Sequence, residues 1–214
     1  MDAKHGDGEV GLNHHTKAFS SEVDTGSREE NASNQNHGAS LLIPSEAKRL
    51  ELARMRLVVI AIGRLKQGPE RELADRYRGR FDDIGRKLGF RGFDVHEIPE
   101  SRARDAKQRI REEAAAILAL APEGAVLVAL DEKGKNIDSA AFADHLGRWR
   151  DESVTSTVFA VGGADGLSPE LRRKARLSVA FGAATWPHQI VRVMLLEQIY
   201  RAATILAGHP YHRG

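Results

Sequence analysis

Short apolar runs alternate with longer amphipathic segments along the chain from residue 55 onward. The short runs have the length and β-branched content of buried strands, whereas the longer segments repeat their apolar residues at helical spacing. This alternation specifies an α/β fold with a parallel sheet. We expect strands at 56–62, 93–98, 125–130, 155–161 and 177–181. We expect helices at 70–88, 105–120, 139–150, 169–175 and 190–207.

Two of the expected helices carry further information. Ser168 is a good N-cap, Pro169 suits the first helical position, and Glu170 stands where the helix dipole favours an anion. The closing helix, 190–207, has apolar residues in nearly every direction around its axis. Such a helix has to be covered on more than one side, and the available covers are its own sheet and a second subunit. We therefore predict a homodimer.

The pattern changes abruptly at Met55. Residues 1–54 are rich in Gly, Asn, Ser, Asp, Glu and His and hold few large apolar side chains. They cannot bury enough surface to offset the entropy lost on ordering. We interpret 1–54 as a disordered N-terminal extension, or as an artefact of where translation was taken to start, and 55–214 as the folded domain.

Composition bounds the class of protein. The 214 residues, 41% of them hydrophobic, suffice for one domain with a sizeable core. The net charge is +2, with the acidic excess confined to the extension, so the folded part is mildly basic and compatible with nucleic acid. The absence of cysteine excludes disulfides and thiolate sites and favours a cytoplasmic protein. No apolar stretch is long enough to predict a membrane span or a secretion signal.

Three loops follow expected strands. Residues 63–68 do not match the sequence motif of a phosphate-binding loop, and we interpret them as an ordinary strand-to-helix turn. Adjacent glycines at 162–166 permit either a ligand close to the backbone or a turn that needs positive φ. The loop 181–188 holds small residues and a tryptophan; it is either a connector or a stretch of exposed backbone that reads the edge of an adenine.

The ending is unusually rich in ring-bearing polar residues. Histidines could move a proton near neutral pH, and tyrosine and arginine suit a nucleotide base and its phosphate. His209 and His212 are three residues apart, but Pro210 interrupts any helix between them and no acidic third ligand is close in sequence. We therefore predict no metal site.

Taken in order, these residues resemble the SPOUT methyltransferases, and specifically the RlmH family, which methylates a pseudouridine in large-subunit ribosomal RNA. The resemblance covers about 55–214 and rests on a set of segments rather than on one motif. These are the opening Met-Arg-Leu strand, Leu130-Asp131, 162–168, Pro187-His188, 191–193, 197–202 and the ending His209-Pro210-Tyr211-His212-Arg213. The extension before Met55 departs from the family pattern.

The resemblance implies an α/β knot with a parallel-sheet core, a deep trefoil knot in the C-terminal half, and a dimer with its site beside the subunit boundary. It also implies that S-adenosylmethionine binds in the knot. Carried over by position, the cofactor-binding residues are Leu130, Gly163, Phe181, Gly182, Ala183, Ala184, Thr185 and Trp186.

The implied reaction is methylation of N(3) of a pseudouridine in 23S rRNA, with assembled ribosomes as the acceptor. Residues expected around the base are His188, Arg192, His209, Tyr211, His212 and Arg213, with no single proton acceptor assigned. The tail of one subunit could approach the cofactor of the other. A catalytically silent RNA-binding or ribosome-associated protein of the same fold is the alternative, and a nucleotide-dependent oxidoreductase is disfavoured by the missing fingerprint.

Overall fold

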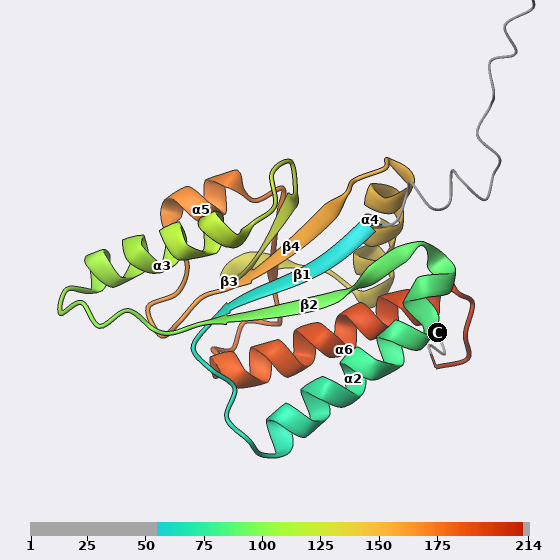
Figure 1. Ribbon diagram of the computed structural model, residues 1–214, viewed down its shortest axis with the longest axis horizontal. Coiled ribbons are helices and arrows are strands. Elements are labelled where there is room, and N and C mark those ends of the chain that lie inside the picture. The colour runs from blue at the N-terminus through green and yellow to red at the C-terminus, as the bar shows by residue number, and fades with distance from the viewer. Residues whose placement is uncertain (1–54, 212–214) are drawn as a thin grey trace, which may run out of the picture. The chain divides into compact units, whose positions relative to one another are not determined.

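The computed structural model describes residues 55–211, in which strands and helices alternate (Figure 1). The sheet order is β2-β1-β4-β3-β5, and every neighbouring pair is parallel, which confirms the predicted α/β class. The prediction of a disordered extension falls on 1–54, outside the described residues. The strands are β1 (Met55–Ile62), β2 (Phe90–Ile98), β3 (Val126–Asn136), β4 (Ser156–Val161) and β5 (Leu177–Ala180). The helices are α2 (Pro69–Gly85), the 3-10 turn η1 (Arg86–Leu88), α3 (Ala106–Leu120), α4 (Ser139–Asp151), α5 (Pro169–Lys174) and α6 (His188–Leu206).

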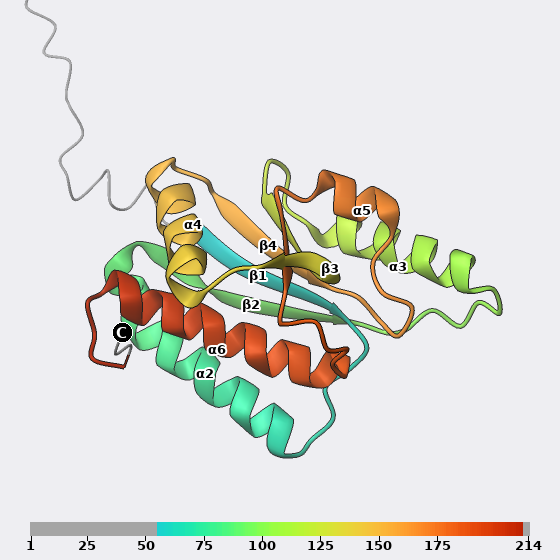
Figure 2. The same ribbon diagram turned by 180° about the vertical axis from the view of Figure 1, so that it is seen from behind.

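Helices cover both faces of the sheet, and this explains the unbroken apolar run of β1. Helices α2, α4 and α6 lie on one face, whereas α3 and α5 lie on the other (Figures 1 and 2). Along β1, Leu57 and Val59 enter the core beneath α2 and α6, and Val58 and Ile60 enter the core beneath α3 and α5. A strand buried on both faces has no polar alternation.

The start of α5 confirms the predicted cap. The Ser168 side chain accepts a hydrogen bond from the Leu171 N–H at 3.0 Å, and Pro169 occupies the first helical position. The cap fixes where the chain turns from the 162–167 loop into the helix. It thereby fixes one side of the loop that follows β4.

Strand β3 is longer than the predicted 125–130. It continues through polar residues to Asn136, and its two halves both pair with β5: Leu130 and Lys135 each partner Val179. Between them, Gly134 lies so close to β5 that a Cβ there would be 2.6 Å from the carbonyl carbon of Val179. The pattern missed this half because it is polar and exposed. The trefoil knot implied by the resemblance stays a prediction.

Helix α6 is packed against more elements of its own chain than the sheet alone, which was the one intrachain contact expected from the sequence. It packs against the sheet, and α2 and α4 flank it as well, which is visible in Figure 2. Met194 and Gln198 remain only partly buried on its outer side. Dimerisation through this side remains a prediction. Within 55–211 no helix combines the length and apolar character needed to cross a membrane.

Candidate active site

The middle of β3 and the loops that follow β4 and β5 meet at the carboxyl edge of the sheet and line a pocket of about 350 Å³. This edge is where open α/β sheets bind ligands. Seven of the eight residues predicted to bind a cofactor line it. They are Leu130, Gly163, Phe181, Gly182, Ala184, Thr185 and Trp186. Ala183 belongs to the same loop but is not among the lining residues.

One wall of the pocket is the glycine turn 162–166. The Gly166 N–H donates to the Gly163 carbonyl oxygen at 3.0 Å, and Gly166 has a φ of +77°. A Cβ on Gly162 would lie 2.8 Å from the carbonyl carbon of Gly166. The two interpretations of this loop are therefore compatible, because the turn needs glycine for its geometry and also faces the pocket.

Behind this wall lies a buried carboxylate that sequence reasoning missed. Glu113 of α3 is 6% exposed; its Oε1 accepts from the Ser101 N–H at 3.0 Å, and its Oε2 has no hydrogen-bond partner within 55–211. A Cβ on Gly163 would be 3.1 Å from that Oε2 and 2.9 Å from the Ile62 side chain. Burial raises the pKa of Glu113. In the sequence, Glu113 looks like an ordinary acidic residue of an amphipathic helix.

The opposite wall is the loop 181–187. Its ends are fixed by two hydrogen bonds: the Trp186 indole N–H donates to the Phe181 carbonyl at 2.9 Å, and the Gly182 N–H donates to Asn136 Oδ1 at 2.8 Å. Asn136 is the last residue of the unpredicted half of β3. Most of this loop is exposed, so its backbone groups are free to meet a ligand.

Within 55–211, three carboxylates line the pocket: Asp131 and Glu132 of β3, and Asp165 of the glycine turn. Asp131 pairs with Arg172, and Asp165 accepts from Arg109 Nε at 2.7 Å. The hydrogen bond from Arg109 lowers the pKa of Asp165. Glu132 lines the pocket and makes no ion pair with another described residue. Arg172 also lines the pocket, so Asp131 and Asp165 are balanced by arginines. Glu132 is the carboxylate that can face positive charge on a ligand.

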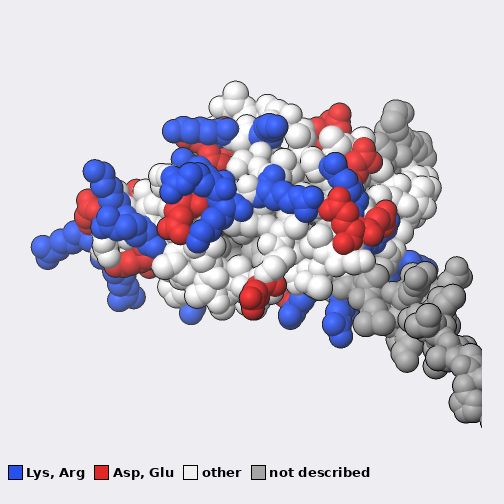
Figure 3. Space-filling model, turned by 90° about the horizontal axis from the view of Figure 1, so that it is seen from above, with Lys and Arg blue, Asp and Glu red and all other residues white. Residues whose placement is uncertain are grey.

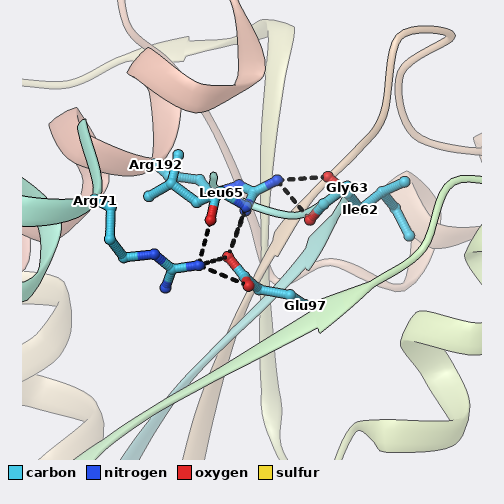
Figure 4. A network of polar contacts seen from close by, with 6 residues as sticks. All are labelled: Ile62, Gly63, Leu65, Arg71, Glu97 and Arg192. Carbon is cyan, nitrogen blue, oxygen red and sulfur yellow. Dashed lines mark hydrogen bonds and ion pairs between the residues drawn. The ribbon is translucent and has the colours of Figure 1, made fainter. Parts of the chain in front are cut away.

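Arg192, which the sequence placed near the base, lies in a buried network instead of lining the pocket (Figure 4). Its side chain is 2% exposed. Nη2 donates to the carbonyl oxygens of Ile62 and Gly63 at 2.7 and 2.8 Å, and Nη1 donates to Glu97 at 3.1 Å. Burial lowers the pKa of Arg192. The guanidinium thus holds the first turns of α6 against the end of β1.

Glu97 is the centre of this network, at the end of β2. Arg71 of α2 donates to both of its carboxylate oxygens at 2.9 Å, and the Leu65 N–H donates to Oε1 at 2.9 Å (Figure 4). Burial opposes ionisation of Glu97, but the hydrogen bonds from Leu65 and Arg71 outweigh it and lower the pKa. No sequence pattern indicates this network, because its members are far apart along the chain.

The remaining residues predicted near the base fall into two places. His188 begins α6 and lines the pocket. Tyr211 follows the end of α6 and folds back onto the helix, where its hydroxyl donates to Glu197 Oε1 at 3.2 Å. His209 Nδ1 accepts from the Tyr211 N–H at 3.1 Å. Glu197 lies nine positions after His188 in α6, which is about 14 Å along the helix axis. His212 and Arg213 lie outside the described residues. Across 55–211, no three His, Asp or Glu side chains are grouped to hold a metal ion.

Comparison with known proteins gives concordant matches. The family model described as "Predicted SPOUT methyltransferase" matches residues 55–212. The ribosomal RNA large subunit methyltransferase H of Nitrobacter winogradskyi is 87% identical over 160 residues, which are 75% of this chain and all of that relative. The protein of the same name from Bradyrhizobium sp. (strain ORS 278) is 80% identical over 159 residues, 74% of this chain and 98% of that relative. A probable methyltransferase of known structure from Bordetella pertussis Tohama I has a TM-score of 0.41 at 15% identity and covers 74% of this chain and 99% of its own.

Proposed function

We propose that this chain, which belongs to the SPOUT methyltransferase family and within it to the family of ribosomal RNA large subunit methyltransferase H, methylates N(3) of a pseudouridine in 23S rRNA. The methyl donor is S-adenosylmethionine. The acceptor is the rRNA of assembled ribosomes, so the enzyme acts in the cytoplasm. The observation that carries the proposal is the pocket formed by the 162–167 turn and the 181–187 loop.

The residues of the pocket fit this cofactor. A volume of about 350 Å³ lies in the range of small-molecule sites. The exposed backbone of the 181–187 loop suits the edge of an adenine, and the close glycine turn lets a ligand approach the main chain. The cofactor carries a sulfonium cation, and the pocket offers the carboxylate of Glu132, which makes no ion pair within 55–211. When bound, the cofactor supplies an electrophilic methyl group.

The protein's main task is alignment, since a sulfonium methyl needs little further activation. The pseudouridine N(3) also carries a proton that must leave. Of the residues predicted around the base, His188 is the described one that lines the pocket, so we place it beside the base. Arg192 acts indirectly in this proposal, because its guanidinium holds the turn that carries His188.

The tail residues His209, Tyr211, His212 and Arg213 face the base from a second subunit. In one chain, Tyr211 packs beside Glu197, well away from His188. A homodimer formed through the partly buried side of α6 would bring a partner's tail toward the pocket. The complete site therefore consists of one subunit's pocket and the other subunit's tail.

The test is incubation of the protein with labelled S-adenosylmethionine and ribosomes that lack the modification, followed by mass analysis of the 23S rRNA. We expect one methyl group on a pseudouridine base. Free rRNA is the comparison substrate and should accept far less label. If the protein bound ribosomes normally but the rRNA acquired no label, the result would contradict the proposal and support the catalytically silent alternative.

A further inference from the structure

Exposed cations gather beside the pocket on the face that carries α3 and α5. They come from the loop after β2 with the first turns of α3, and from α5 with the residues that follow it. Residues 100–112 and 169–176 together hold nine Lys and Arg against four Asp and Glu. Figure 3 shows this concentration of Lys and Arg side chains.

Five of these cations form what we call the basic surface. Each is exposed and makes no ion pair with another described residue: Arg102, Arg104, Lys107, Arg111 and Arg173. Three of the four neighbouring carboxylates accept a hydrogen bond or form an ion pair within this region, and Glu100 makes no ion pair with another described residue. Asp105 accepts from the Gln108 N–H, Glu112 accepts from the Ser101 hydroxyl, and Glu170 pairs with Lys174. Hydrogen bonds from neutral donors leave the carboxylates charged, so the net positive charge of this region follows from its nine cations against four carboxylates.

The basic surface is fixed to the wall of the pocket. Arg109 Nη1 donates to the carbonyl oxygens of Ala103 and Arg104 at 3.0 Å each. The same guanidinium donates to both carboxylate oxygens of Asp165, at 2.7 and 3.1 Å, and Asp165 lines the pocket. Glu113 adds a second link: its carboxylate lies beside Gly163 of the pocket wall and accepts from the Ser101 N–H in the loop before α3. A ligand held by these cations thus lies at a defined place beside the pocket.

We propose that the basic surface binds the sugar-phosphate backbone of the folded RNA whose base enters the pocket. This inference rests on the proposed function and names the part of the enzyme that positions its substrate. Exposed Arg and Lys without interleaved aromatic side chains suit phosphates rather than stacked bases. Contacts of this kind fix orientation and carry little sequence information, which leaves recognition of the base to the pocket.

The test compares two triple variants of equal charge change. Arg104→Gln/Lys107→Gln/Arg111→Gln removes part of the basic surface. Arg86→Gln/Lys87→Gln/Arg91→Gln is the control. These residues are also exposed and without ion pairs in 55–211, but they lie in η1 and at the start of β2, on the opposite edge of the sheet. Binding to ribosomes that lack the methyl group is measured over a range of salt concentrations. Calorimetry with S-adenosylmethionine alone checks the pocket.

For the basic-surface variant we expect binding weakened about tenfold or more near 0.1 M salt, and a logarithmic salt slope reduced by about 2 to 3. The control variant should keep the wild-type slope, and both should bind S-adenosylmethionine normally. Equal loss in the two variants, or an unchanged slope in the first, would overturn this inference. Wild-type protein that binds ribosomes with the expected slope yet transfers no methyl would instead refute the proposed function and leave the basic surface standing.

Discussion

The two ends of α6 each carry an arginine paired with a glutamate, but the pairs differ in setting. Near the start, Arg192 is 2% exposed and reaches Glu97 on another element. Near the end, Arg201 is 29% exposed and pairs with Glu197 four residues earlier on the same helix, at 2.6 Å. The first pair joins α6 to the edge of the sheet beside the pocket. The second stabilises only the helix surface and the tail that folds over it.

This difference separates two kinds of polar residue near the site. Removing Arg192 takes a donor from two buried backbone carbonyl groups as well as from Glu97. Removing Arg201 orphans no carbonyl group, and Glu197 keeps hydrogen bonds from Gln198 and Tyr211. The start of α6 is therefore a rigid support for His188. The end of α6 is a surface on which tail residues such as Tyr211 can be rearranged at little cost.

The largest expected effect comes from breaking the first pair. Arg192→Met leaves Glu97 and the carbonyls of Ile62 and Gly63 without this donor, and we expect unfolding to be easier by about 3 to 5 kcal/mol. Arg201→Met is the matched control, with an expected change of about 0 to 1 kcal/mol. Denaturant unfolding measures both. Similar losses of unfolding free energy in the two variants would show that the two ends of α6 are held equally firmly.

The fold was predictable because it depends on local patterns. Strand β1 has an apolar run buried on both faces, and α5 begins at a sequence-coded cap, so both were found from the order of residues alone. The second half of β3 was not, because Lys135 and Asn136 pair with β5 through the backbone and their side chains carry no strand pattern.

The site was predictable in part. Residues that follow strands, such as Gly163, lie at the pocket because the carboxyl ends of parallel strands meet at one edge. Contacts between distant segments could not be found in this way. The Arg192 and Glu97 pair joins residues 95 positions apart, and Glu113 faces Gly163 only once α3 has packed on the sheet.

The next effect concerns the pocket itself. In Gly163→Ala the new Cβ would lie 2.9 Å from Ile62 Cγ2 and 3.1 Å from Glu113 Oε2, and both neighbours are buried. We expect a loss of about 1 to 3 kcal/mol in unfolding free energy and about tenfold weaker S-adenosylmethionine binding, measured by denaturation and calorimetry. Gly79→Ala is the control; it lies in α2 with nothing within 4 Å of its Cβ and should stabilise by about 0.5 to 1 kcal/mol. If Gly163→Ala bound S-adenosylmethionine with unchanged affinity, this turn would not be part of the cofactor site.

Mixed dimers test whether the pocket and the tail of one site come from the same subunit or from different subunits. One subunit lacks residues 209–214; the other carries Ala184→Trp, which fills the pocket but keeps its tail. If the tail acts in trans, random pairing gives heterodimers with one complete site, and we expect about a quarter of wild-type methyl transfer. Each variant alone should be inactive. A mixture as inactive as its components would place the tail and pocket of one site in the same subunit.

The smallest effect tests the loosely held end of α6. Burial, and then the negative charge of Glu197, raise the pKa of Tyr211 to about 12. A phenol whose pKa is higher in the folded state than the unfolded value of about 10 contributes stability that is complete below pH 10 and is lost as the pH rises toward 12. Tyr211→Phe should therefore flatten the fall in unfolding free energy between pH 10 and 12. At pH 8 it should cost less than about 1 kcal/mol, because the bond to Glu197 is 3.2 Å long and only partly buried. Denaturation of both proteins at pH 8 and pH 11 measures the difference, and parallel pH curves would show that Tyr211 is not held against Glu197 in solution.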